Sequence, residues 1–148
     1  MANLIFNVSL GRVAAYADLP QVSDGLVLVP LEASGLVGDA TMRDYDTLAD
    51  ILAGATNEQT SIGRKPLTGV TVTVDDANDR VSIDAADVVW TSPTGNPVGA
   101  VVICYDSDTT SGTDSALVPV AKQDVNWSPD GTTFTLGIAD FARVSSTG

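Results

Sequence analysis

The chain has 148 residues, 44% hydrophobic and 18% charged, and its 19 acidic against seven basic side chains give a formal net charge of −12. These values predict one globular domain over residues 1–148 with a self-sufficient core, and they exclude a disordered chain. They argue against nucleic acid or an anionic membrane surface as a partner, and no apolar run approaches the ~20 residues of a membrane-spanning helix.

The N-terminal thirty residues are expected to form two strands separated by a short helix. Apolar residues alternate over residues 4–10, which predicts a first strand rather than a signal peptide. Residues 12–18 can form a short helix that ends before Pro20. The continuous apolar run 26–29, bounded by glycine and proline, predicts a strand that is buried on both faces.

One convincing helix is predicted between Thr41 and Gly54. Thr41 followed by Asp44 resembles a capping box, and Gly54 is placed to end the helix. Asp46 and Asp50 are four residues apart, so we expect both on the solvent side of this helix. The apolar residues recur at helical spacing and predict a face that packs on the core, formed by Met42, Tyr45, Leu48, Ala49 and Leu52.

From residue 68 onward the apolar period changes to two. This alternation predicts strands over residues 70–74 and 81–83, joined by the turn-forming residues 75–79. A further short strand is expected over residues 87–90. Residues 98–105 form the longest apolar run, and we predict that they are the central strand.

The last third of the chain alternates between polar loops and short strands. The polar stretch 106–115 predicts a surface loop, and Pro119 in the apolar stretch that follows indicates an edge position or a bulge. Residues 125–138 predict a hairpin closed by Pro129-Asp130-Gly131. The small polar residues 144–148 are expected to form a mobile tail. Together these elements predict a mainly β fold, either an antiparallel β-sandwich or an open barrel, with one short packed α-helix.

The residues that could carry catalysis are few. The chain contains no histidine, which excludes serine–histidine and cysteine–histidine catalysis and the usual zinc sites. Two carboxylate pairs, Asp84 with Asp87 and Asp75 with Asp79, have the residue types for acid–base work, but they fall at predicted turns where solvated carboxylates have no raised pKa. No phosphate-binding glycine motif occurs. We therefore predict a non-enzymatic protein with no catalytic residues and no cofactor.

The loop between Asp106 and Asp114 is the best candidate for a calcium site. It begins with oxygen-bearing side chains at alternate positions, as an EF-hand loop does. Gly112 then comes one residue late, and Leu117 occupies the position of the final ligand. We interpret the loop as a turn whose side chains bind their own backbone, with calcium as the alternative, and predict no metal site.

Three further side chains are candidates for reactivity or for binding a partner. Cys104 lies in an apolar run without a nearby basic residue, which favours a small buried hydrophobe over a reactive thiol. Trp90 and Trp127 are interpreted as core residues, with a role as interface anchors as the alternative. The only adjacent cations are Arg64 and Lys65, which is too few for a nucleic-acid surface.

Several short motifs resemble a group of small virion proteins from tailed phages, especially phages that infect actinobacteria. The resemblance is carried by Gly11-Arg12-Val13, by DYDTLADILAG, by Asn78-Asp79-Arg80, by Asp87 with Trp90, and by CYDSDTT leading to Pro119. It covers residues 11–119, most of the chain. The segment between Arg12 and Val27 is more compact than in that group, which leaves its local geometry open.

The resemblance implies a structural protein of the virion, made in the cytoplasm of the host bacterium. The first hypothesis is a capsid decoration protein that binds the shell of major capsid protein, as a homo-oligomer or at symmetry-related positions, with contacts in the 106–115 loop and the N-terminal strand. The second is a tail or head–tail connector component. The third, from another class, is a carbohydrate- or calcium-binding adhesive module, against which the aromatic content of 5% argues.

Overall fold

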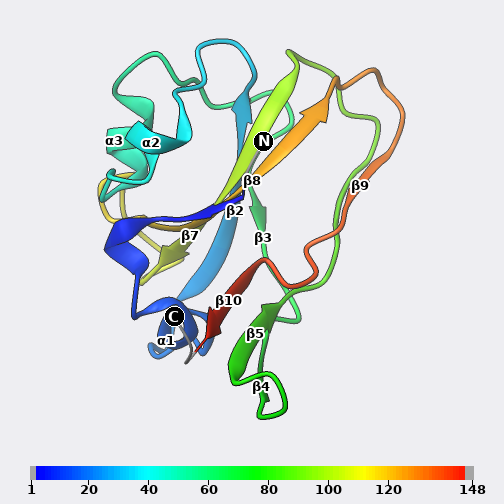
Figure 1. The fold of residues 1–148 in the computed structure, drawn as a ribbon. Coiled ribbons are helices and arrows are strands. Elements are labelled where there is room, and N and C mark those ends of the chain that lie inside the picture. Colours follow the sequence, from blue (N-terminus) through cyan, green and yellow to red (C-terminus); the bar gives the residue numbers. More distant parts are fainter. Residues whose placement is uncertain (1–2, 146–148) are drawn as a thin grey trace.

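The computed structural model describes residues 3–145, and its architecture is mainly β with little helix (Figure 1). All strand pairs are antiparallel, which confirms the predicted mainly β, sandwich-like class. The largest sheet has five strands in the order β1 (Leu4–Ile5), β8 (Val118–Trp127), β7 (Val98–Asp106), β2 (Gly25–Glu32) and β3 (Lys65–Pro66). The apolar run 98–105 is the central strand of this sheet, as predicted.

Two smaller sheets complete the β structure. A three-stranded sheet has the order β10 (Ala142–Ser145), β5 (Arg80–Asp84) and β4 (Thr71–Asp75), and a two-stranded sheet pairs β6 (Val88–Trp90) with β9 (Phe134–Leu136). The hairpin of β4 and β5 projects from the body, and β9 runs along a separate arm (Figure 1). The predicted strands over residues 70–74, 81–83 and 87–90 are therefore confirmed.

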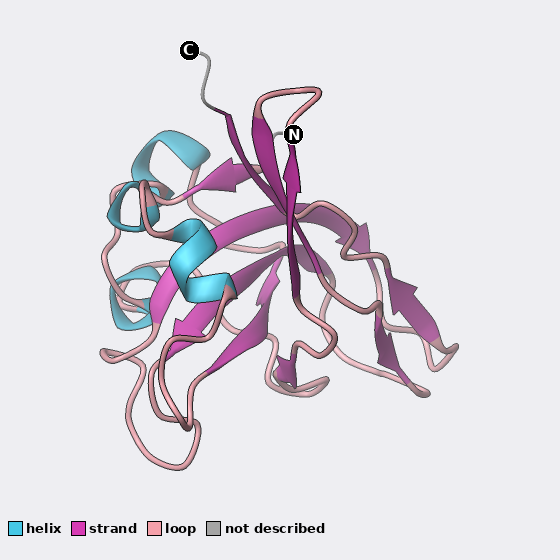
Figure 2. Cartoon of the chain, turned by 90° about the horizontal axis from the view of Figure 1, so that it is seen from below, coloured by secondary structure: helices cyan, strands magenta, loops and turns pink. Residues whose placement is uncertain are grey.

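Both faces of the five-stranded sheet are buried. Val101, Ile103 and Tyr105 of β7 belong to one hydrophobic cluster with residues of the smaller sheets and of α1 (Val13–Ala17). The alternate residues Val102 and Cys104 belong to a second cluster, with residues of α2 (Asp39–Met42) and α3 (Leu48–Leu52). Figure 2 shows that all the helices, drawn in cyan, lie toward one side of the molecule. This double burial explains why β2 and β7 are continuous apolar runs.

The helix predicted after Thr41 is two short helices, α2 and α3, with an extended residue between them. Thr47 has φ −136° and ψ 160° and caps α3: the Asp50 amide donates to Thr47 Oγ1 (3.1 Å), and the Thr47 amide donates to Asp50 Oδ2 (3.0 Å). The real capping box thus lies six residues after the predicted one, and Asp46 precedes α3 instead of sharing a helix face with Asp50. A Thr-x-x-Asp pattern occurs at both places, and tertiary packing selects the second.

The N-terminal strand is shorter than predicted. β1 ends at Ile5, and a 3₁₀ turn, η1 (Asn7–Ser9), follows. Ser9 Oγ donates to the Pro119 carbonyl at 2.6 Å, and Asn7 Nδ2 donates to Asp44 at 2.7 Å, so side-chain hydrogen bonds replace the strand ladder. Leu10, expected on the buried face, is 62% exposed. The short helix expected over residues 12–18 is present as α1.

The C-terminal hairpin prediction is wrong. β8 ends at Trp127, and β9 pairs with β6 through Trp90 opposite Phe134 and Val88 opposite Leu136. The turn at residues 129–131 exists, with the Gly131 amide donating to the Pro93 carbonyl, but it connects two different sheets. Of the predicted mobile tail, Val144 and Ser145 lie in β10, and residues 146–148 lie outside the described part of the chain.

Pro119 occupies the bulge that was one of its two predicted settings. β8 lies between β1 and β7, but β1 pairs only with residues 121 and 122, so no strand pairs with the other side of β8 at Pro119. The pairing shifts between Ile103, which faces Ala121, and Cys104, which faces Pro119. The missing amide of a proline is tolerated where the ladder is already interrupted.

Candidate protein-interaction surface

The three-stranded sheet has one apolar face and one polar face. Because successive residues of a strand point to opposite faces, its register places two rungs of apolar side chains on one side. The inner rung consists of Val72, Ile83 and Ala142, and the outer rung consists of Val74, Val81 and Val144. The opposite face carries threonine, serine, aspartate and arginine side chains. We call the outer rung the valine surface.

The two rungs differ sharply in burial. Ile83 and Ala142 are buried in the first hydrophobic cluster, where α1 packs against all three strands. In the valine surface, Val74 is 68% exposed and Val144 is 41% exposed. The sheet thus extends one rung beyond the body of the protein and carries its apolar pattern into solvent. The three valines line a hollow of about 330 Å³, together with Asp76, Asp79, Arg80 and Ser145.

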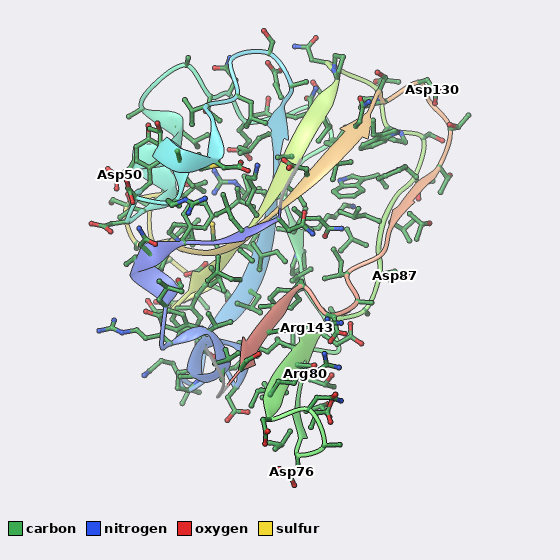
Figure 3. All side chains as sticks on the ribbon, viewed as in Figure 1. Asp50, Asp76, Arg80, Asp87, Asp130 and Arg143 are labelled. Carbon is green, nitrogen blue, oxygen red and sulfur yellow. The ribbon has the colours of Figure 1, made fainter. Side chains whose placement is uncertain are left out.

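Negative charge lies at the turn end of the valine surface. The hairpin of β4 and β5, residues 71–84, carries four aspartates and one arginine, a formal charge of −3. Asp76 is exposed at the tip of this hairpin (Figure 3), and no cation of residues 3–145 forms an ion pair with it. The exposed apolar face is therefore bordered by acid at its outer end.

The two arginines of this sheet are already paired within the chain. Arg80 Nε lies 3.1 Å from Asp75 Oδ2, and Arg143 forms an ion pair with Asp140. Hydrogen bonding from Asn78, together with the charge of Arg80, lowers the pKa of Asp75, and the hydrogen bond from Arg143 lowers the pKa of Asp140. Both carboxylates are therefore charged at neutral pH, and neither arginine offers an uncompensated positive charge.

The outer edges of the three-stranded sheet are open. β5 lies in the middle, and within residues 3–145 no strand pairs with the outer edge of β4 or of β10. Open edges present unpaired backbone donors and acceptors to a neighbouring chain. An apolar face next to open strand edges is typical of a protein-contact surface.

The loop between Asp106 and Asp114 forms hydrogen bonds within itself. Asp108 Oδ1 accepts from the Thr110 amide (3.0 Å), and Asp108 Oδ2 accepts from Ser111 Oγ (2.7 Å). The bonds from Thr110 and Ser111 lower the pKa of Asp108. Residues 3–145 contain no group of three or more acidic or cysteine side chains placed to hold a metal ion. These contacts support the interpretation of the loop as a self-satisfied turn.

Arg64 fastens this loop to the body. Its guanidinium binds Glu58 through two nitrogens, at 2.8 and 2.7 Å, and Asp114 through a third at 2.8 Å. The Ala49 amide of α3 donates to the Asp114 carbonyl as well. The C-terminal end of the loop is therefore held by both a side chain and the backbone, and its role as a contact site stays a prediction.

The carboxylates that could form catalytic pairs accept hydrogen bonds from backbone amides or from residues of their own turn. Asp84 accepts from the Ala85 amide at 2.8 Å, and Asp87 accepts from the Ile138 amide at 3.4 Å. Asp75 binds Asn78 and Arg80 in the hairpin turn, and Asp79 has the positive φ of 49° that such a turn requires. Each position therefore has a structural explanation.

The two tryptophans pack with Phe134 in one aromatic cluster, in which Trp90 is a core residue as predicted and Trp127 lies half-buried against the core. Trp90 is 2% exposed, and its Nε1 donates to the Gly63 carbonyl at 3.4 Å. Trp127 is half-buried and stacks on Phe134 with ring centroids 4.0 Å apart and planes inclined by 12°. Phe134 thus covers one face of Trp127, and the cluster fastens β9 to β8.

Cys104 is expected to resist thiol reagents in the folded protein. It is fully buried, and this burial raises the pKa of its thiol well above the ordinary value. Ellman's reagent should therefore leave native protein unlabelled and react completely once urea unfolds it, because only the exposed thiolate is nucleophilic. Rapid labelling without urea would contradict this placement.

A buried ion cluster is the feature that the sequence interpretation missed. Lys122 on β8 is 3% exposed, and its Nζ contacts Asp124 Oδ1 at 2.6 Å and Asp39 Oδ1 at 2.5 Å. Burial alone would lower the pKa of Lys122, but the hydrogen bonds from its ammonium to Asp124 and Asp39 outweigh it and raise the pKa. The cluster links the first turn of α2 to the face of the five-stranded sheet on which α2 and α3 pack.

Two further findings concern membrane spans and similarity to known proteins. None of the helices in residues 3–145 is long and apolar enough to cross a membrane. Comparison with protein-family models, with curated proteins and with solved structures found no match in any of the three.

Proposed function

We propose that the protein is a non-enzymatic structural component of a tailed-phage virion, and that it decorates the capsid by binding the shell of major capsid protein. Several copies occupy symmetry-related positions on the shell. The observation that carries the proposal is the valine surface, because it leaves Val74 and Val144 exposed side by side with the half-buried Val81 on a projecting sheet, where a protein contact would cover them.

Two further features support a contact role over chemistry. The candidate carboxylates bind backbone amides or local turn residues, and every buried side-chain nitrogen or oxygen among residues 3–145 has a hydrogen-bond partner. A buried polar atom without a partner often marks a ligand or catalytic site. The sequence motifs over residues 11–119 supply the likeness to virion proteins, and the exposed valines supply a surface through which such a protein can bind.

Cryo-electron microscopy of intact virions tests the proposal. We expect density for this fold at quasi-equivalent positions on the outside of the icosahedral shell. Density only along the tail or at the portal vertex would replace the decoration role with the tail or connector role. Purified particles without the protein would contradict both and return attention to a role outside the virion.

A further inference from the structure

The valine surface combines an apolar centre with an acidic border, and this composition indicates what kind of surface on a partner would fit it. Its centre is apolar, with Val74 and Val144 from two strands on either side of Val81. Its border is acidic, because Asp76 is exposed and the nearby arginines are paired with Asp75 and Asp140. A partner gains contact with the valines only by approaching the acidic border as well.

We infer that the valine surface docks onto a partner protein with an apolar contact patch bordered by lysine or arginine. This rests on the proposed function, and it adds which surface binds and what chemistry receives it. Complementary charge at the border of an interface steers the encounter and disfavours wrong partners. The apolar centre supplies the contact that excludes water.

Charge argues against a second copy of this chain as the occupant. Two copies carry −12 each, and contact through the valine surface brings together two hairpin turns, each with Asp75, Asp76 and Asp79 against the single cation Arg80. Like charges that face each other at an interface oppose association. The open edges of β4 and β10 could pair with another copy in hydrogen-bonding terms, but the acidic border acts against that approach.

The test compares matched variants on virions from a phage whose gene for this protein is deleted. Val74→Asp places a charge in the valine surface. Val89→Asp is the control, because Val89 is 45% exposed, lies in the separate strand β6, and changes charge equally. We expect wild type and Val89→Asp to co-sediment with the virions alike, and Val74→Asp to bind at least about tenfold more weakly. Circular dichroism and a melting curve verify that each variant is folded.

A second variant, Asp76→Lys, tests the basic border without touching the valines. It should weaken binding several-fold, mainly through slower association, and reduce the salt dependence. For wild type, raising sodium chloride from about 50 to about 500 mM should weaken binding, because salt screens charges across the border. Binding that is unaffected by salt and by Asp76→Lys would overturn the inference that the partner's patch has a basic border.

The other outcomes separate the two proposals. Equal binding of Val74→Asp and wild type would overturn the inference and leave the decoration role standing. Failure of wild type to bind the virions at low salt would overturn the decoration role and, with it, the inference. A wild-type dimer in sedimentation velocity that Val74→Asp dissociates would identify a second copy as the occupant and overturn the inference.

Discussion

Replacing Lys122 with alanine is expected to lower the free energy of unfolding by about 3–5 kcal/mol. The Lys122 side chain is 3% exposed, and its ammonium lies within hydrogen-bond distance of Asp124, whose side chain is 7% exposed. Removal of the cation leaves a buried carboxylate without a counterion, which costs more than the lost ion pair itself. Urea denaturation followed by far-UV circular dichroism measures the difference.

The other lysine of the chain provides the control. Lys65 lies half-buried on the two-residue strand β3, and Lys65→Ala should cost about 1 kcal/mol or less. The double variant Lys122→Met/Asp124→Asn removes both buried charges with little change in side-chain volume, so it should recover much of the loss. Equal destabilisation by Lys122→Ala and Lys65→Ala would contradict the buried cluster.

The same cluster makes the stability of the fold depend on pH. Folding raises the pKa of Lys122 above its ordinary value of 10.5. A raised pKa means that the folded state binds the proton more tightly, so this stabilisation is complete below pH 10.5 and is lost as the pH rises through the folded-state pKa. The difference in stability between wild type and Lys122→Ala should therefore stay constant near neutral pH and narrow only in strong alkali.

The second large effect is expected for Trp90→Ala, at about 3–5 kcal/mol of lost stability. Trp90 is 2% exposed and lies with Trp127 and Phe134 in the cluster that fastens β9 to β8. Truncation opens a cavity between the main sheet and the two-stranded sheet and removes the hydrogen bond to Gly63. Equilibrium unfolding in urea measures the loss.

Trp127→Ala is the matched control for this truncation. Trp127 is half-buried, so its removal leaves a site that solvent reaches, and we expect a loss of about 1–2 kcal/mol. The ranking is the sharper part of the prediction. A loss for Trp127→Ala as large as that for Trp90→Ala would show that the outer ring, and not the buried one, holds the arm in place.

The strands were predictable because their apolar patterns are local and strong. β2 and β7 are continuous apolar runs, and the valines of β4 alternate with threonines, so each pattern has one natural interpretation. The pairing of strands was less predictable. β9 was assigned to β8 because a turn joins them in sequence, but Phe134 pairs with Trp90, which is 44 positions earlier in the chain.

The region of α2 and α3 shows a second limit of local patterns. Apolar spacing suits one helix from Thr41 to Gly54, but the chain bends at Thr47 so that α3 can bind the loop, with the Leu48 amide donating to the Leu117 carbonyl at 2.9 Å. Thr47 with Asp50 is a capping pattern in the sequence, but Thr41 with Asp44 has the same pattern, and only this contact distinguishes the two. The break is a product of tertiary structure.

The valine surface was only half predictable. The alternation at Val70, Val72 and Val74 was recognised, but a pattern of period two indicates which face is apolar and not where the body of the protein ends along the strand. The third strand, β10, overlaps residues 144–148, whose small polar composition predicted a mobile tail. Likewise Lys122 looks like any surface lysine until the register places it between Leu4 and Val102.

The antiparallel order of the main sheet also sets when the protein can fold during synthesis. β1 pairs with residues 121 and 122 of β8, and the Asn3 side chain accepts from the Asp124 amide, 121 positions away. The ribosome must therefore release the chain as far as residue 124 before the first strand finds its partner. Until then the apolar runs of β2 and β7 can pair with each other but lack their covering layers, so we expect the nascent chain to depend on chaperones until β8 emerges.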